Sequence, residues 1–588
     1  MKRNTITILI VLLSVSILFA TLLTLPRIDK AQPDPYFHIK ITPIIYWIGL
    51  SLSIFVTLGI VFRKKEGNIP HCLGLFSVML LSVYVYDIPK LFYINPIYTD
   101  TYIFVGELFY TLRSGHIGWG HSYETPGLAL LSSQFSLITG INYIVIAEIL
   151  QFVLPVLMVV LVYIISKLFA SERVGLLACL VFVSIDWIGF YFNRQSLALV
   201  LQMFVYFALF KAMWFRPVKY KVWFAVAILS YIALVVSHPL SSLLVVLTLL
   251  SLTVLIGLYS LVRRVRHTTS NDGSLLRRHL ALKASQLFLV FLVIWFSWNI
   301  YNYKSFESLI NAVRLTIQEL MSGPNPVGPA GSFVSGYTAN YLPIVYLRLL
   351  EFVFVAIIGL ALVFILVGKT KSRWKGLILL SWFIGSILIA PAGLYTGHFF
   401  DRSFLHVFPV FSIVFAWFII PKTPTSQIPK SNRKAWVKAI KVYLLSTMII
   451  FVFMLPITMY CNTPFFYPPT SHLKEMNHVT KHGYGYIAVY EADSTLGYFK
   501  LLNNASNIIT DFQYNYTTIT EYGTVVTTFR AYTKGAFIVE QPSATESIMD
   551  IENGLTKNPT FARVYDADPW NRIYFKQSGN KTSLKPES

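Results

Sequence analysis

Charged residues are scarce in this chain of 588 residues. Lys, Arg, Asp and Glu make up 13% of it, whereas 55% of its residues are hydrophobic. A soluble domain carries about 25% charged residues. The composition therefore excludes an ordinary soluble protein and predicts one that crosses a membrane many times.

Cysteine is scarce as well. Cys72, Cys179 and Cys461 are far apart in the sequence and lack the paired spacing of a metal site. At most one disulfide can form among them, and we expect none. This excludes a fold that depends on many disulfides.

The distribution of charge excludes a nucleic-acid partner. The chain has a net charge of +21, but residues 462–588 hold 11 Lys and Arg against 12 Asp and Glu. The positive surplus therefore lies between the apolar segments. Basic loops in such positions are typical of the cytoplasmic side of a membrane protein, and not of a surface that binds nucleic acid.

Apolar runs of spanning length predict about 13 transmembrane helices. The runs lie at residues 5–25, 41–62, 70–87, 141–166, 174–191, 196–214, 222–237, 241–262, 284–300, 344–368, 376–395, 403–421 and 442–460. The first run follows a basic start and is about 20 residues long, so we interpret it as an uncleaved signal-anchor helix.

The loops between these runs indicate the orientation. With the N-terminus in the cytoplasm, the segments on the cytoplasmic side hold 27 Lys and Arg against 3 Asp and Glu. This asymmetry predicts a multi-pass cell-membrane protein with a cytoplasmic N-terminus and an extracytoplasmic C-terminal region. The apolar piece at 128–139 is too short to cross the hydrocarbon core, so we expect a short helix at the outer surface.

The topology divides the chain into two predicted domains. Residues 1–461 form a polytopic transmembrane domain with large outer loops at 88–126 and 301–343. Residues 462–588 contain β-rich runs such as "GYIAVYEAD" and "FARVYDADPWNRIYF", separated by helical and turn signals. We therefore predict a membrane all-α fold followed by a soluble extracytoplasmic α/β domain.

Ionisable residues gather in the first outer loop, "YTDTYIFVGELFYTLRSGHIGWGHSYETPG". The pattern from 102 to 112 predicts an amphipathic helix along the membrane surface, on which we expect Glu107 to be solvated. Ionisable groups at membrane depth are costly, so their clustering on one face indicates a functional cavity. The candidate residues near the outer helix ends are Asp100, His121, Glu124, Arg194, His238, His398 and Arg402.

A carboxylate surrounded by arginine and histidine suits glycosyl transfer from an anionic lipid. The carboxylate takes a proton from the acceptor hydroxyl or holds a metal. The cations bind the leaving phosphate, to which arginine gives bidentate contacts. Asp100 is the predicted catalytic residue, and the other six residues are predicted to bind substrate.

The sequence around Asp100 resembles the first outer loop of the GT-C superfamily of integral-membrane glycosyltransferases. The resemblance lies in Asp100, the aromatic Tyr102, the helix "LFYTLRSGH" that ends near a glycine, and "ETPGLALL". The tail "FARVYDADPWNRIYF" is similar to the close of archaeal members. The resemblance implies inverting transfer of a hexose from a polyprenyl- or dolichyl-phosphate carrier to a glycan, lipid or protein acceptor on the outer face.

Two departures from the GT-C pattern bear on the chemistry. Many members carry a second acidic residue beside the first, where this chain has "TDTY". A metal-independent base and a carboxylate that holds Mg²⁺ or Mn²⁺ therefore both stay open. The tripeptide "WWD" does not occur, which argues against the branch that modifies protein sequons. Arg402 loosely corresponds to the outer-end arginine that meets the lipid phosphate in relatives.

A transporter or flippase is the main alternative, and a non-catalytic surface-anchoring protein is a third. Transporters show repeated halves with matching Gly- or Pro-interrupted helices. The loops at 88–126 and 301–343 share no such pattern. The ionisable residues also lie near the outer ends of the spans and not at the midplane. We therefore favour the enzyme.

Overall fold

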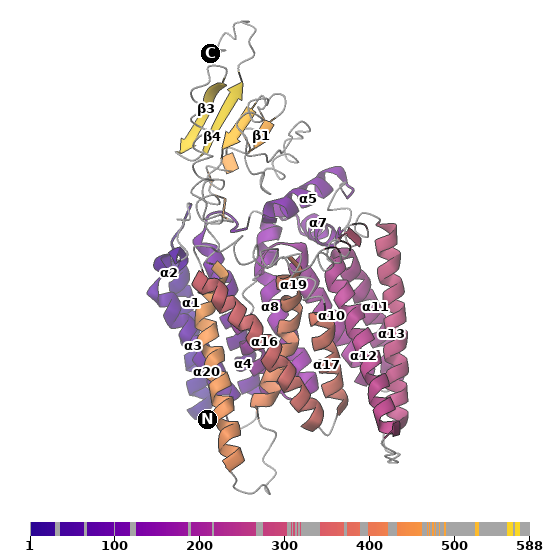
Figure 1. The fold of residues 1–588 in the computed structure, drawn as a ribbon. Helices are drawn as coiled ribbons and strands as arrows, with labels where there is room; N and C mark the ends of the chain where they lie inside the picture. Colours follow the sequence, from indigo (N-terminus) through magenta and orange to yellow (C-terminus); the bar gives the residue numbers. More distant parts are fainter. Residues whose placement is uncertain are drawn as a thin grey trace.

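The apolar segments form a helical bundle, seen from the side in the computed structural model (Figure 1). The structure describes residues 2–29, 36–63, 68–98, 100–117, 125–185, 190–214, 217–265, 274–302, 342–369, 373–388, 398–420 and 432–460, scattered residues within 307–318 and 467–481, and the strands 487–489, 524–527, 561–568 and 571–576.

A helix occupies each of the predicted apolar ranges. These helices are α1 (Lys2–Leu23), α3 (Ile44–Val61), α4 (Asn68–Ser82), α8 (Tyr143–Phe169), α9 (Glu172–Ile185), α10 (Arg194–Trp214), α11 (Pro217–Ser237), α12 (Pro239–Val265), α13 (Ser274–Tyr301), α16 (Leu342–Lys369), α17 (Arg373–Ile387), α19 (His398–Ile419) and α20 (Asn432–Tyr460). Within the described residues, eight helical segments are long and apolar enough to cross a membrane. The mostly helical membrane fold is therefore confirmed, and the number of about 13 spans stays a prediction.

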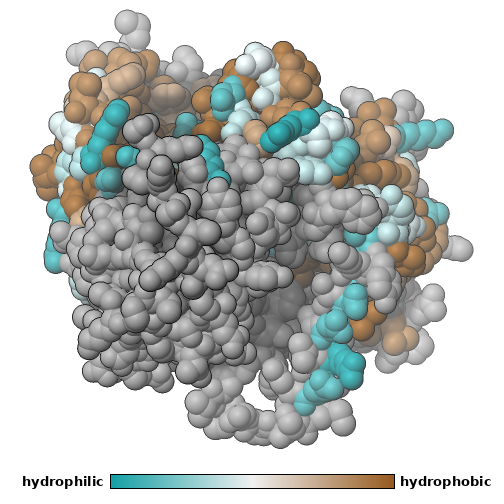
Figure 2. Space-filling model, turned by 90° about the horizontal axis from the view of Figure 1, so that it is seen from above, coloured by the Kyte–Doolittle hydropathy of each residue, from teal (hydrophilic) through white to brown (hydrophobic). Residues whose placement is uncertain are grey.

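The helix α9 forms the centre of the bundle. Every residue from Val174 to Ile185 is buried, as expected of a helix that is apolar on all sides. It packs against α3, α8, α19 and α20. Peripheral helices instead expose large apolar side chains, such as Leu229 on α11 and Val293 on α13. Hydrophobic residues also lie along the upper and right-hand edges of the molecule when it is viewed from above (Figure 2).

Short helices lie across one end of the bundle. They are α5 (Asp100–Ser114) and α7 (Gly127–Thr139), which pack on each other and on α8 (Figure 1). Helices at these two places are what the sequence predicts. With 13 residues, α7 is too short to cross about 30 Å of hydrocarbon.

Four strands follow the helices in the C-terminal part of the chain. They are β1 (Ile487–Val489), β2 (Thr524–Thr527), β3 (Phe561–Asp568) and β4 (Asn571–Lys576). The sheet has the order β1-β2-β4-β3, with β1 and β2 parallel and the other two pairs antiparallel. β1, β3 and β4 fall in runs that the sequence predicts as β-rich. The boundary at 462 and the α/β class of this domain stay predictions.

The sheet, α5 and α7 lie at the same end of the bundle, and the N-terminus lies at the other (Figure 1). This arrangement agrees with a topology in which the first outer loop and the C-terminal region share one side of the membrane. The assignment of that side to the cell exterior rests on the positive-inside rule.

Cysteine labelling tests the orientation. In a protein lacking its native cysteines, we expect a single cysteine at Glu307 or Lys474, both exposed, to react with a membrane-impermeant maleimide added to intact cells. A cysteine at Thr268, in a basic segment predicted to be cytoplasmic, should react only after lysis. Labelling of position 268 in intact cells would reverse the topology.

Candidate functional site

Asp100 begins the helix α5 and is exposed. The N-terminal end of a helix stabilises a negative charge, so a carboxylate is well suited to this position. The helix starts from Tyr98, whose carbonyl accepts a hydrogen bond of 3.0 Å from the Thr101 N–H. It ends at Gly115, whose φ of 71° is a left-handed conformation that glycine adopts readily.

The middle of α5 is held by a buried ion pair. Arg194, the first residue of α10, donates from Nη2 to Oε1 of Glu107. The side chains of Arg194 and Glu107 are only 12% and 9% exposed. The Arg194 guanidinium also lies 5.2 Å from the ring centre of Phe104, one turn earlier on α5. The expectation that Glu107 is solvated is therefore wrong, because the apolar side of α5 faces the bundle and carries Glu107 with it.

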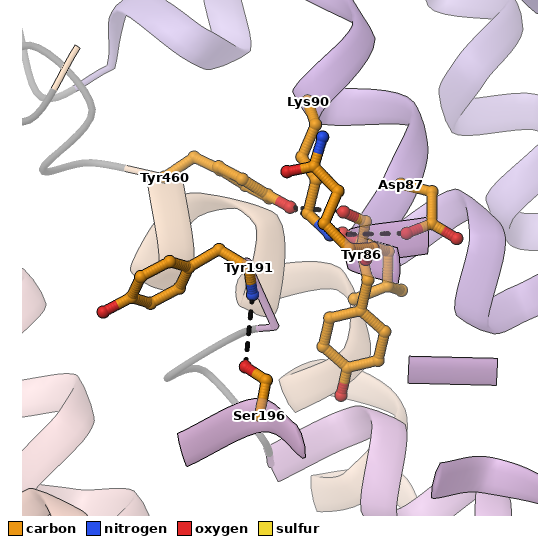
Figure 3. Close-up of polar contacts among 8 residues, drawn as sticks. Tyr86, Asp87, Lys90, Tyr191, Ser196 and Tyr460 are labelled. Carbon is orange, nitrogen blue, oxygen red and sulfur yellow. Dashed lines mark hydrogen bonds and ion pairs between the residues drawn. The ribbon is translucent and has the colours of Figure 1, made fainter. Parts of the chain in front are cut away.

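A second contact joins the loop before Asp100 to the start of α10. The rings of Tyr98 and Tyr191 stack with their centres 4.4 Å apart. Tyr191 donates its N–H to Ser196 Oγ at 3.4 Å (Figure 3). Asn193 caps α10 by accepting from the Ser196 N–H at 2.6 Å. The segment before α5 and the middle of α5 are thus both held against the start of α10.

His238 also lies at a helix start. Its Nδ1 accepts a hydrogen bond of 3.2 Å from the backbone N–H of Ser241, which caps α12. The first residue of α7, Gly127, packs beside it, because a Cβ on Gly127 would come 2.9 Å from the Cα of Ser237. The "ETPG" segment therefore needs glycine at this position to bring α7 onto the junction of α11 and α12.

A polar junction connects the loop before α5 to the C-terminal part of the chain. Asn95 donates from Nδ2 to the carbonyl of Pro468 at 3.1 Å and to Oγ1 of Thr470 at 3.2 Å. Asp29 accepts from the Thr470 N–H at 2.8 Å. Tyr467 packs in the same junction, and burial raises its pKa to about 12. Residues from three distant parts of the sequence thereby fix the chain five residues before Asp100.

His38, in the short helix α2 (Phe37–Ile41), is enclosed beside this junction. It is 3% exposed and stacks against Phe92 and Tyr460, with ring centres 5.0 and 4.8 Å away. Its Nε2 has no hydrogen-bond partner within the described part of the chain. Burial lowers the pKa of His38 to about 3.

The buried imidazole predicts an acid-sensitive stability. The pKa of His38 is 6.5 in its ordinary state and about 3 in the fold, so the unfolded chain binds more protons between these values. The free energy of unfolding is therefore highest above pH 6.5 and decreases as the pH falls below it, by roughly 1 kcal/mol at pH 5.5. We expect H38F, which keeps the ring stacking, to unfold in detergent with a smaller loss of stability between pH 7.5 and 5.5. An equal loss in both proteins would exclude His38 as the cause.

The remaining predicted residues are placed only in part. His121 and Glu124 lie outside the described residues. His398 and Arg402 fall in the first turns of α19, and their side chains lie outside the described ones. The structure thus brings Asp100, Arg194 and His238 onto elements at one end of the bundle, and the substrate contacts predicted for these residues stay predictions.

Metal binding is the second role open to Asp100. Within the described residues, no three His, Cys, Asp or Glu side chains come together as a metal site. Asp100 is an exposed carboxylate that can accept a proton, and a metal at Asp100 would need further ligands from elsewhere in the loop or from the substrate.

A second buried ion pair, which was not predicted from the sequence, lies beneath the loop. Lys90 Nζ lies 3.4 Å from Asp87 Oδ1, and both side chains are 5% exposed (Figure 3). The spacing of three residues in "DIPK" is a signal for such a pair. Its position at the end of a membrane span, Cys72–Phe92, was a second signal, because an intramembrane charge needs a partner.

Solved membrane glycosyltransferases share this architecture. The archaeal oligosaccharyltransferase AglB from Archaeoglobus fulgidus, in complex with an inhibitory peptide and a dolichol-phosphate, matches with a TM-score of 0.52 at 11% identity, over 87% of this chain and 75% of AglB. The apo form of the Archaeoglobus fulgidus oligosaccharyltransferase matches with a TM-score of 0.50 at 12% identity, over 81% and 72% of the two chains. The chain has the GT-C fold.

The two oligosaccharyltransferase matches confirm the GT-C fold that the resemblance around Asp100 predicts. ArnT from Cupriavidus metallidurans, bound to undecaprenyl phosphate, matches with a TM-score of 0.45 at 11% identity, over 90% of this chain and 97% of ArnT. No protein-family model matches the chain, and no curated protein matches its sequence.

Proposed function

We propose that the chain is a membrane glycosyltransferase that moves a sugar from a polyprenyl-phosphate carrier to an acceptor at the outer face. The observation that carries the proposal is the exposed carboxylate of Asp100 at the start of α5, on a GT-C fold. AglB has been solved with a dolichol-phosphate, which supports a lipid carrier of the same chemical class here.

Asp100 acts as the general base in this proposal. Its carboxylate accepts the proton of an acceptor hydroxyl, and the acceptor oxygen forms a bond to the anomeric carbon of the sugar. The bond between that carbon and the phosphate oxygen breaks on the opposite side. The phosphate leaves with the bonding electrons as polyprenyl phosphate, so one displacement inverts the anomeric configuration.

Basic groups would stabilise the phosphate as it leaves. His398 and Arg402 are four residues apart in α19, a spacing that brings two residues to one face of a helix. We propose these two as the main phosphate ligands, with His121, Glu124 and His238 contributing to the substrate site. Arg194 already has Glu107 as its partner, so its proposed share in phosphate binding is smaller.

A transfer assay tests the proposal. We expect purified protein, incubated with polyprenyl-phosphate sugars and a membrane lipid and glycan extract, to yield an acceptor heavier by one hexose together with free polyprenyl phosphate in mass spectra. Protein boiled before the assay is the control. Movement of labelled lipid-linked sugar across vesicles without any transfer product would favour the flippase alternative and contradict the enzyme.

Chelation separates the two roles open to Asp100. The "TDTY" sequence has a single acidic residue, which favours a metal-independent base. We therefore expect EDTA to leave the rate unchanged. A rate abolished by EDTA and restored by Mg²⁺ or Mn²⁺ would instead make Asp100 a metal ligand, because a hard divalent ion is held by carboxylate oxygens.

A further inference from the structure

A proline inside α8 creates an unfilled backbone acceptor. Pro155 has no N–H, so the carbonyl four residues earlier, that of Gln151, lacks the usual helical hydrogen bond from position 155. Lys90 provides the missing hydrogen bond by donating from Nζ to the Gln151 carbonyl oxygen at 3.0 Å. A side chain at the end of the Cys72–Phe92 span thus binds directly to the backbone of α8.

The charge of Lys90 is compensated where it lies. The Asp87 carboxylate is 3.4 Å away, and the ring centre of Phe152 is 5.6 Å from the ammonium. A buried cation is tolerated when a carboxylate and further acceptors surround it. Figure 3 shows the Lys90 ammonium pointing to the Asp87 carboxylate, with a dashed line for the ion pair.

The helix turn that carries Asp87 is irregular and is held from outside. A π-helical turn, η1 (Val83–Asp87), passes into a 3₁₀ turn, η2 (Ile88–Phe92). The Tyr460 hydroxyl donates to the carbonyl of Tyr86 at 3.0 Å, and the Tyr46 hydroxyl donates to that of Tyr84 at 3.0 Å. Side chains of α3 and α20 therefore hold two sides of this turn, and Lys90 holds it to α8.

Side chains do not pack completely between the η1–η2 turn and α8. A groove of about 410 Å³ lies there, lined by Leu18 and Leu22 of α1, by Asp87 and Leu91, and by Phe152 and Val156 of α8 among others. Because apolar packing across this groove is incomplete, the bond from Lys90 to Gln151 carries more of the connection between η2 and α8. Asp100 follows Lys90 by ten residues.

We propose that Lys90 is a positioning residue for Asp100. The chain from Lys90 to α5 passes through Asn95 and Tyr98, whose contacts place the start of α5. A shift of η2 away from α8 would strain both contacts and so displace Asp100. The inference rests on the proposed function for its activity readout. Its structural readout, the distance between α5 and α8, does not depend on that function.

The test removes the ion pair without leaving a buried charge. In D87L/K90M both partners become apolar, so no unpaired charge is left. The stability that is lost comes from the missing hydrogen bond to the Gln151 carbonyl. We expect turnover to fall about 10- to 100-fold, the effect of a displacement of roughly 1 Å at a reacting group, with the KM for the lipid donor unchanged. Spin labels at Arg113 and Glu148, both exposed, should show a broader distance distribution between α5 and α8.

Adding P155A tests whether Lys90 positions Asp100 or only provides a hydrogen bond to the Gln151 carbonyl. Alanine restores a helical donor to Gln151, so D87L/K90M/P155A should regain melting temperature but not turnover or the narrow label distance. P155A alone, the matched control, should keep wild-type turnover. Recovery of turnover in the triple variant, or an unchanged label distance in D87L/K90M, would overturn the inference. If the wild type transfers no sugar, the proposed function fails, and the label distances still decide the role of Lys90.

Discussion

Replacing Asp100 by asparagine is expected to lower sugar transfer at least ~100-fold while leaving the fold intact. Asparagine keeps the size of the side chain but cannot accept the proton of the acceptor hydroxyl. Asp100 is exposed at the start of α5, so the substitution breaks no core packing. Turnover, donor affinity and melting temperature of D100N should be measured side by side with the wild type.

Two further variants serve as comparisons for D100N. D100E moves the carboxylate by about one methylene, and reacting geometry tolerates little displacement, so only a trace of activity should remain. E148Q changes another exposed carboxylate, on α8, and should be as active as the wild type. Near-normal sugar transfer by correctly folded D100N would show that Asp100 is not the catalytic base and only begins α5.

The local elements around Asp100 could be predicted from the sequence because their signals are local. Helix α5 has its acidic first turn, its apolar side and Gly115 within 16 residues. Helix α7 is marked by a proline and a glycine at its start and by Gly140, with a φ of 68°, after its end. Such capping signals set the boundaries of a helix without reference to the rest of the fold.

The partners of the buried charges could not be predicted, because they depend on contacts between distant segments. Glu107 and Arg194 are 87 residues apart, and Lys90 and Gln151 are 61 residues apart. The sequence shows that Pro155 must free a carbonyl in α8. It does not show which of the chain's basic residues reaches that carbonyl, since this requires the packing of η2 against α8.

The second large effect is expected at the ion pair that holds α5. E107Q leaves the Arg194 guanidinium buried, at 12% exposure, without its counter-charge. Breaking a buried pair by removing one partner costs about 3–5 kcal/mol. We expect a lower melting temperature in detergent and faster proteolysis within α5. Wild-type stability of E107Q would show that the pair is solvated and of little consequence.

The double variant E107L/R194M separates the structural role of Arg194 from its predicted role in substrate binding. Removing both charges leaves no uncompensated ion, so most of the stability lost in E107Q should return. If Arg194 only holds α5, donor affinity should return with it, because the phosphate would be bound by other groups. If Arg194 also contacts the phosphate, the stable double variant should still bind the donor weakly, since one charge-assisted contact is missing. A restored melting temperature with restored donor affinity would therefore remove Arg194 from the predicted substrate site and leave Arg402 as its arginine, beside the three histidines.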